Sequence, residues 1–345
     1  MGSTVVAVDP LYDSPAGADE LVATAHRYGR YRLYAEHERI EIDLGRGLLQ
    51  RHDSVQAFLR TGGARGPVAD PRAAAARTSY LREEYAYGTR AHIGGVESFL
   101  HHPRLIAGAV EVHGRPVVEP AIAYANLMVP GQELATHTDV PEFRGANRKG
   151  LPQWLLVVMH HSGLFDPWRL HIATGIAWFQ DSDDGQLRYW PDGPGAPPVV
   201  QAVRANTAMV LDTDSVFHAV DPVAPDVEPP LVRPGAGLVA GARGNDDADA
   251  RRWTLSDADG TPVATYDWDD LRFSVSWKAY CFADEAERDA WRDHTDDLTA
   301  DAVVARLVGD LVARGRVPAG VAVDRDLGLL MIDEYVRYPA APSPV

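Results

Sequence analysis

His137 and Asp139 stand one residue apart in the stretch PGQELATHTDVPEFRG, and this spacing suits a metal site. If residues 134–139 form a strand, side chains two positions apart point to the same side, so an imidazole and a carboxylate converge. A second histidine would complete the face of two histidines and one carboxylate that binds Fe(II) in non-haem oxygenases. The pair alone is a weak signal, because such spacing arises easily by chance in a chain with 13 histidines.

The same tripeptide recurs near the C-terminus as His294-Thr295-Asp296. Aspartates flank this second copy, and it stands between two predicted helices, where Asp297 or Thr299 can cap the next helix. No alternating pattern of apolar and polar residues leads into it. The surroundings therefore predict a solvated turn for the second copy.

The first copy has a candidate third ligand. His218 ends the alternating stretch MVLDTDSVFHAV, which predicts a strand. The stretch RFSVSWK then places Arg272 and Ser274 on one face of a further strand. Burying Arg272 is costly unless it meets an anion. Beside an iron site, its guanidinium suits a dicarboxylate such as 2-oxoglutarate, one end of which chelates the metal.

Four strings in this order resemble the Fe(II)- and 2-oxoglutarate-dependent dioxygenases, and most of all their prolyl-hydroxylase-like branch. The strings are Gly131-x-x-Leu134-x-x-His137-x-Asp139, Gly185-x-Leu187-x-x-Trp190-Pro191, His218 and Arg272-x-Ser274. Each string is weak alone, whereas the order is fairly specific, and the resemblance covers residues 115–282.

The resemblance implies a double-stranded β-helix, a jelly-roll or cupin-like fold. It implies that His137, Asp139 and His218 bind Fe(II), and that O₂ and 2-oxoglutarate are consumed with release of succinate and CO₂. It also implies that Arg272 and Ser274 hold the distal carboxylate of the cosubstrate. Because relatives that halogenate have a small residue in place of the carboxylate ligand, Asp139 favours hydroxylation, desaturation or ring closure.

One departure from the family pattern concerns the arginine. In many members it follows the second histidine closely, and Arg233 in PPLVRPGAG fits that spacing better than Arg272 does. We prefer Arg272, because it begins an alternating strand with Ser274 beside it, whereas Arg233 lies in a turn-like segment between prolines.

Further polar residues have both a functional and a structural interpretation. Tyr124 and Asn126 share one face of a predicted strand and either hydrogen-bond the cosubstrate or satisfy neighbouring strands. Arg144 is a tentative substrate-binding residue or part of a surface salt bridge. Lys278 is explained equally well as a strand-end residue whose amine reaches solvent. His160 and His161, at the end of the predicted strand WLLVVMHHSG, are more simply structural.

The chain divides into three predicted regions. Residues 1–114 are predicted to be a helical and mixed region that packs on the core, with one helix over residues 70–88. Residues 115–282 have short β-rich stretches separated by turn residues, which predict the oxygenase core. Within it, residues 222–270 are rich in Pro, Gly and Asp and predict an irregular insertion, a possible lid, with a hairpin at Asp259-Gly260. Residues 283–345 return to helix.

Composition limits the partners. The formal charge of −16 argues against polyanionic partners such as nucleic acid or an anionic membrane surface. Cys281 is the single cysteine, which fits a reducing cytoplasm, and neither a secretory signal nor an apolar span is visible. We therefore predict a cytoplasmic enzyme that acts on a small molecule such as an amino acid or a biosynthetic intermediate. The alternatives are a cupin-like metalloenzyme that does not use 2-oxoglutarate and a non-catalytic jelly-roll binding protein.

Overall fold

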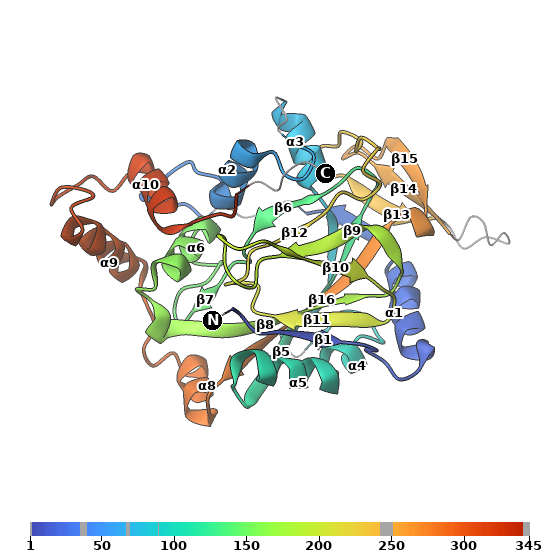
Figure 1. Cartoon of the computed structure of the whole chain (residues 1–345), viewed down its shortest axis with the longest axis horizontal. Helices are drawn as coiled ribbons and strands as arrows, with labels where there is room; N and C mark the ends of the chain where they lie inside the picture. Colours follow the sequence, from blue (N-terminus) through green and yellow to red (C-terminus); the bar gives the residue numbers. More distant parts are fainter. Residues whose placement is uncertain (1, 35–39, 67–69, 89, 242–250, 341–345) are drawn as a thin grey trace.

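The computed structural model describes residues 2–34, 40–66, 70–88, 90–241 and 251–340 (Figure 1). Its helices are α1 (Pro15–Tyr28), α2 (His52–Thr61), α3 (Pro71–Thr78), α4 (Glu97–Leu100), α5 (Pro103–His113), α6 (Gln153–Ser162), α8 (Glu285–Arg292), α9 (Ala300–Ala313) and α10 (Arg325–Tyr335). No helix among the described residues is long and apolar enough to cross a membrane.

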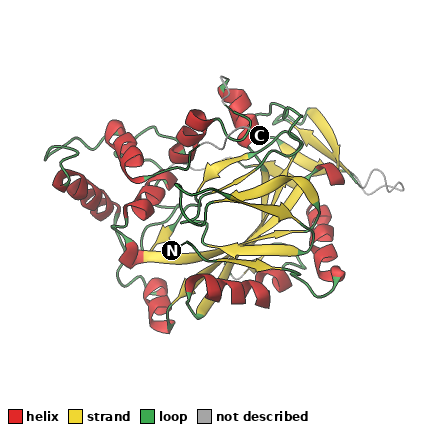
Figure 2. Ribbon diagram, in the orientation of Figure 1, coloured by secondary structure: helices red, strands yellow, loops and turns green. Residues whose placement is uncertain are grey.

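The strands form a main sheet of twelve and a minor sheet of four, and every pairing between described strands is antiparallel. The main sheet runs in the order β1 (Val5–Val8), β11 (Thr207–Leu211), β8 (Arg169–Trp178), β16 (Arg272–Phe282), β5 (Val117–Met128), β3 (Leu81–Tyr87), β2 (Arg30–Leu33), β13 (Gly237–Ala240), β14 (Arg252–Ser256) and β15 (Pro262–Asp267). Two short strands, β4 (Arg90–Ala91) and β7 (Glu142–Phe143), pair with β3 and β8. The predicted class, a mainly β core with flanking helices, is confirmed at this level (Figure 2).

The minor sheet runs in the order β10 (Val199–Val203), β9 (Ser182–Tyr189), β12 (His218–Val220) and β6 (Leu134–His137). Residues of β6, β9 and β12 line one cavity together with residues of β5, β8 and β16 from the main sheet. The two sheets therefore face each other across this cavity.

Strand β16 is buried along nearly its whole length because both of its faces are covered. Phe273, Val275 and Trp277 pack into the largest apolar cluster, which contains residues of α1, α4 and α5. The alternate residues Arg272, Ser274 and Ser276 line the cavity. The predicted alternation of RFSVSWK is thus confirmed, and it is what turns a row of polar groups toward the cavity.

The prediction of one helix over residues 70–88 is wrong in its second half. Helix α3 ends at Thr78, and Ser79 has extended backbone angles. The following residues form β3, which pairs with both β2 and β5, and Leu81 and Tyr85 are fully buried. Pairing on both edges and burial outweigh the helix propensity of the Arg-Glu-Glu run.

The stretch that contains His160 and His161 is a helix, α6, and the predicted strand is wrong. Residues Gln153 to Met159 are all buried, and Gly163 ends the helix with a left-handed backbone. A short run that is apolar on all sides fits a buried helix as well as a buried strand, so periodicity does not separate the two. Helix α10 near the C-terminus was not predicted as a separate element.

Residues 222–270 are more regular than the predicted excursion. Strands β13, β14 and β15 extend the main sheet beyond β2, and the hairpin between β14 and β15 is confirmed, with Gly260 at φ 85°. Part of the segment, residues 242–250, lies outside the described residues. Likewise, residues 1–114 contribute strands β1 to β4 to the main sheet. The division into three regions and the lid stay predictions.

Candidate metal centre

His137 and His218 face each other across two neighbouring strands. His137 is the last residue of β6, His218 is the first residue of β12, and the two are direct partners in the antiparallel register. Their ring centroids are 4.3 Å apart. The prediction that His218 ends one long strand is wrong. Strand β11 stops at Leu211, and a turn separates it from β12.

Asp139 lies two residues beyond the end of β6, and its backbone N–H donates to the carbonyl of Thr213 at 2.8 Å. Its Oδ1 is 3.7 Å from Nε2 of His137 and 3.8 Å from Nε2 of His218. The three side chains offer ligand atoms that all lie within 4.8 Å of one another, and they are the one such group of three or more His, Cys, Asp or Glu side chains among the described residues.

The other atoms of these side chains already have partners. Nδ1 of His137 lies 2.7 Å from the carbonyl oxygen of Ala135, and Nδ1 of His218 lies 3.0 Å from that of Val216. A carbonyl can only accept, so each Nδ1 carries the proton and each Nε2 keeps its lone pair. Backbone partners of this kind fix the orientation of metal-binding histidines. The donor set therefore fits a divalent transition metal.

Asp139 is held in place through its second oxygen. Oδ2 accepts from the amine of Lys278 at 2.7 Å and from the hydroxyl of Thr213 at 2.6 Å, which leaves Oδ1 for a metal. Burial alone would raise the pKa of Asp139, but Lys278 and the two histidines hold that pKa well below its usual range. Burial, and then His137, lower the pKa of His218 to about 4. At neutral pH the carboxylate of Asp139 is thus ionised and the imidazole of His218 is neutral.

Lys278 is a partner of the metal centre that sequence reasoning missed. Its side chain is 8% exposed, so the interpretation as a solvent-reaching strand-end residue is wrong. The signal was present in the sequence, because Lys278 shares the cavity-facing parity of Arg272, Ser274 and Ser276 on β16. Thr213 carried no comparable signal, since its place depends on the turn between β11 and β12.

Arg272 lies in the same cavity as the three ligands, 4% exposed. Its Nε donates to the carbonyl of Gly185 at 2.5 Å, and the guanidinium forms no ion pair with any described residue. Burial lowers the pKa of Arg272 to about 10, so it stays charged at neutral pH. A Cβ on Gly185 would lie 2.7 Å from Cδ of Arg272, which explains why glycine suits that position.

Ser274, Tyr124 and Asn126 also line the cavity. Nη1 of Arg272 lies 3.4 Å from Oγ of Ser274. The amide of Asn126 donates to Ser276 at 3.2 Å, while its Oδ1 is buried without a hydrogen-bond partner. A bound polar ligand would supply partners both to this guanidinium, which forms no ion pair with a described residue, and to the unpartnered Oδ1 of Asn126.

Several candidates lie elsewhere. Arg144 is paired with Asp296 at 2.7 Å and does not line the cavity. His160 contacts Ser215 at 3.1 Å, and His161 stacks on Phe217, so neither reaches the cavity. Arg233 is 66% exposed and is paired with Asp257 and Asp259.

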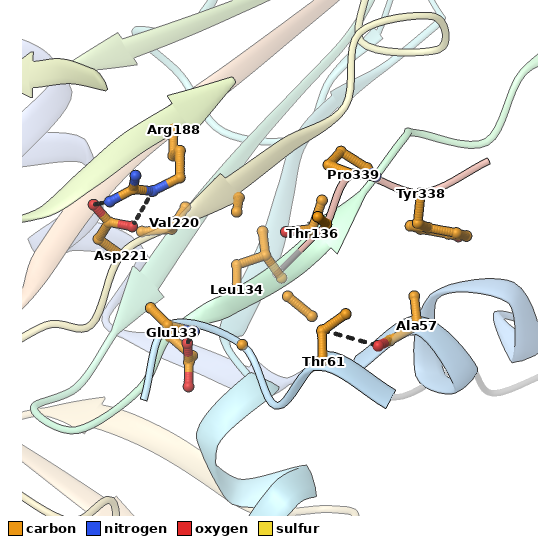
Figure 3. Close-up of a pocket in the computed structure, with 15 residues that line it drawn as sticks. Ala57, Thr61, Glu133, Leu134, Thr136, Arg188, Val220, Asp221, Tyr338 and Pro339 are labelled. Atoms are coloured by element: carbon orange, nitrogen blue, oxygen red, sulfur yellow. Dashed lines mark hydrogen bonds and ion pairs between the residues drawn. The ribbon is translucent and has the colours of Figure 1, made fainter. Parts of the chain in front are cut away.

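A second pocket lies between α2, the strands β6 and β12, and the C-terminal residues Tyr338 and Pro339 (Figure 3). Each charged side chain that lines it has a partner of opposite charge. Arg188 forms two hydrogen bonds of 2.9 Å with Asp221, and Glu133 is paired with Arg77. The pocket therefore offers no unpaired charge, in contrast to the metal cavity.

No family model and no curated protein matches this chain. Comparison with solved structures finds the non-haem α-ketoglutarate-dependent epimerase SnoN of nogalamycin biosynthesis, at 10% identity and a TM-score of 0.40, covering 81% of this chain and 79% of that one. It also finds a Pseudomonas putida prolyl-4-hydroxylase, at 11% identity and a TM-score of 0.38, covering 81% and 93%. The carbocyclase SnoK matches at 10% identity and a TM-score of 0.40, covering 84% and 87%. At this distance no residue role transfers, so the site is assigned from its own side chains.

Proposed function

We propose that this chain is an Fe(II)- and 2-oxoglutarate-dependent oxygenase that acts on a small molecule. The observation that carries the proposal is the set of three free donor atoms, Nε2 of His137, Nε2 of His218 and Oδ1 of Asp139, at one cavity. Two histidines and one carboxylate with open positions are the ligands of non-haem Fe(II) oxygenases. The predicted double-stranded β-helix is part of this proposal, supported by two antiparallel sheets that face each other around the ligands.

The proposed cosubstrate site lies on β16. Arg272 supplies a buried guanidinium that forms no ion pair with any described residue, and Ser274 supplies a hydroxyl beside it. A planar guanidinium binds a carboxylate through two parallel hydrogen bonds. We assign the distal carboxylate of 2-oxoglutarate to these two residues, and the unpartnered Oδ1 of Asn126 and the hydroxyl of Tyr124 to polar contacts with the bound molecule.

When bound, iron, O₂ and 2-oxoglutarate supply the oxidation, with release of succinate and CO₂. The chain's own residues bind and orient. His137, Asp139 and His218 would hold the metal, while Lys278 and Thr213 hold Asp139 so that one oxygen remains free. The carboxylate ligand favours hydroxylation, desaturation or ring closure of the substrate. A cytoplasmic location, and the exclusion of nucleic acid and membrane partners, stay predictions from composition.

Experiment can distinguish the proposed oxygenase from two alternatives. A cupin-like metalloenzyme would bind iron without needing 2-oxoglutarate, and a non-catalytic jelly-roll protein would bind neither. The unpaired Arg272 opposite the ligands favours the oxygenase over both. Anaerobic titration with Fe(II), followed by 2-oxoglutarate, tests the proposal through the charge-transfer absorption of the chelated complex. If iron binds but the band does not appear, the cupin-like enzyme is favoured. If iron does not bind, both the oxygenase and the cupin-like enzyme are ruled out.

The substrate is best sought by product detection. Succinate formation in a screen of amino acids and natural-product precursors identifies substrates, and the product mass identifies the outcome. Gain of one oxygen indicates hydroxylation, whereas loss of two hydrogens indicates desaturation or cyclisation. Absence of 2-oxoglutarate-dependent succinate formation across such a screen, even in the presence of bound iron and cosubstrate, would count against an oxygenase of this class.

A further inference from the structure

The peptide group between the ligands His137 and Asp139 is held by a side chain from outside the metal cavity. Thr138, which separates the two ligands, is fully buried. Its carbonyl oxygen accepts from Nη2 of Arg51 at 2.8 Å, and Arg51 stands at the start of α2, remote from β6 in the sequence. Because both ligands flank this one residue, the orientation of its peptide group affects the direction in which each ligand side chain points.

Arg51 is held in turn by the carboxylate of Asp53. Nε of Arg51 donates to Oδ1 at 3.2 Å, and Nη2 donates to Oδ2 at 3.1 Å. The side chain of Asp53 is 0% exposed and that of Arg51 is 19% exposed. Burial alone would raise the pKa of Asp53, but Arg51 and the hydroxyl of Tyr338 hold that pKa below its usual value, so the pair is ionised at neutral pH. Two parallel hydrogen bonds of this kind fix the plane of a guanidinium.

Tyr338 joins the C-terminal segment, residues 336–340, to this ion pair. The segment follows α10, and Tyr338 lines a pocket together with residues of α2 and β6 (Figure 3). Its hydroxyl donates to Oδ2 of Asp53 at 2.9 Å. A continuous series of hydrogen bonds therefore runs from the C-terminal segment through Asp53 and Arg51 to the carbonyl between the two ligands.

The same tyrosine also contacts the strand that supplies the third ligand. The ring centroid of Tyr338 lies 5.1 Å from that of Phe217, and Phe217 directly precedes His218. Phe217 is 2% exposed, and the ring of His161 stacks on it as well. Aromatic pairs at this distance prefer particular relative orientations, so they restrict how the backbone beside them lies. One side chain near the C-terminus thus contacts the supports of both ligand strands, β6 and β12.

We propose that Arg51, Asp53 and Tyr338 are positioning residues of the metal centre, and that the C-terminal segment is a working part of that centre. Arg51 fixes the peptide between the first two ligands, while Tyr338 holds Arg51 through Asp53 and contacts Phe217 through its ring. The three side chains do not line the cavity, so they act through the ligands and not on the substrate. The inference rests on the proposed function in one respect, the binding of a divalent metal, and does not require 2-oxoglutarate.

The first test removes the contact of Arg51 with the carbonyl. Loss of a partner that orients a ligand typically weakens metal binding by roughly 10- to 100-fold, and we expect this loss for Fe(II) and Co(II) in Arg51→Met. The visible absorption of bound Co(II) should also change, because it reports the arrangement of the ligands. Arg51→Lys should recover part of the affinity, since an ammonium still donates but cannot form both contacts with Asp53. Arg144→Met is the matched control, because Arg144 likewise pairs with a carboxylate, that of Asp296, and donates to a backbone carbonyl, that of Pro167, outside the cavity.

The second test removes one hydroxyl group. Tyr338→Phe keeps the ring contact with Phe217 and should weaken binding of both metals by roughly two- to tenfold, the effect of one hydrogen bond. Tyr335→Phe is its control, because the hydroxyl of Tyr335 donates to Asp310 of α9 at 2.6 Å, and its loss should leave metal affinity unchanged. The double variant Arg51→Met with Tyr338→Phe should bind metal as Arg51→Met alone does, since the hydroxyl acts through Arg51.

The outcomes separate this inference from the proposed function. If the wild type binds neither metal, both are overturned. If the wild type binds metal and the Arg51 and Tyr338 variants match its affinities and its Co(II) spectrum, the positioning role is overturned and the proposed function stands, even where melting temperatures fall. An equal loss of metal affinity in Tyr335→Phe would also overturn it, because the effect would then be a general one. The expected losses in a chain that binds metal but not 2-oxoglutarate would support the inference and contradict the oxygenase.

Discussion

The tripeptide His-Thr-Asp occurs twice in this chain, and the two copies have opposite surroundings. The side chain of His137 is 11% exposed and faces His218, whereas the side chain of His294 is 71% exposed and is paired with Asp297. His137 closes a paired strand, while His294 lies in a turn with a positive φ of 55°. The histidine and the aspartate of this tripeptide thus join a candidate metal-binding group only where a neighbouring strand brings a second histidine.

The two aspartates differ in the same way. Each has one cationic partner at 2.7 Å: Lys278 for Asp139, and Arg144 for Asp296. The side chain of Asp139 is 20% exposed and that of Asp296 is 46% exposed. A charge pair in a nearly buried site matters much more to stability than one that water screens. Burial and strand pairing, and not the tripeptide itself, therefore separate the two copies.

The largest expected effect is on metal binding. We expect His137→Ala, Asp139→Ala and His218→Ala each to abolish turnover and to weaken Fe(II) binding by more than about 100-fold, since loss of even an outer partner costs 10- to 100-fold. His294→Ala, the matched variant in the second copy, should leave both unchanged. Anaerobic Fe(II) titration, with circular dichroism to confirm folding, makes the comparison. Loss of iron by His294→Ala with retention by His137→Ala would reverse our choice of tripeptide.

The next effect concerns Lys278. Removing one partner of a buried ion pair costs about 3–5 kcal/mol, because the other charge is left uncompensated. We therefore expect Lys278→Met to destabilise the metal-free protein by about 3 kcal/mol, and a bound divalent metal to restore part of that loss by compensating Asp139. Chemical denaturation with and without Zn(II) measures both terms. Lys149→Met, at the chain's other lysine, is the exposed control. Equal stability of the Lys278 variant and the wild type would show that Asp139 does not depend on this cation.

The sequence predicted which candidate ligands lie together better than it predicted the residues that hold them in place. His137, Asp139 and His218 were identified because spacing, order and strand alternation are local or family properties. Lys278 and Thr213 were missed or misread because their role depends on which strand lies beside Asp139. Tyr80, which lines the cavity, was placed inside a predicted helix, and it lies instead between α3 and β3. What the sequence did not predict was therefore set by contacts between distant segments.

The secondary-structure elements show the same contrast between local pattern and contacts among distant segments. The strand predicted from the clear alternation of RFSVSWK is found as β16, which begins at Arg272 as expected. The wrong assignments, at residues 79–88 and in α6, concern short stretches that are buried on all sides or flanked by two partners. In those stretches periodicity carries little information, and tertiary pairing decides the structure.

The third prediction compares two arginines. Truncating one partner of a buried charge pair costs about 2–5 kcal/mol. Arg272→Leu should therefore weaken 2-oxoglutarate binding by roughly 30-fold to several thousand-fold and leave iron affinity nearly unchanged. Arg272→Lys should recover only part, because an ammonium cannot form the bidentate contact. Arg233→Leu, in the exposed pair with Asp257, should stay within a few-fold. The charge-transfer band of the anaerobic complex reports 2-oxoglutarate binding by each variant. Loss of the band in the Arg233 variant alone would contradict the assignment of the cosubstrate carboxylate to Arg272.

The smallest expected effect is in the second tripeptide, at the pair of Arg144 and Asp296. A hydrogen bond from Arg144 lowers the pKa of Asp296 below its usual value. The pair therefore stabilises the fold above the unfolded-state pKa, and this contribution is lost as the pH falls through the lower folded-state pKa. A double-mutant cycle of Arg144→Met and Asp296→Asn should give a coupling energy of about 0.5–1 kcal/mol at pH 7, because Asp296 is half exposed to screening water. The coupling should shrink as the pH is lowered toward about 3, and the exposed pair of Arg60 and Asp333 should show less coupling at either pH. Urea denaturation of the wild type, the two single variants and the double variant measures this coupling energy. A coupling above about 3 kcal/mol, the range of a buried pair, or any change of Fe(II) affinity in Asp296→Asn, would mean that the second copy is not the solvated turn that its exposure indicates.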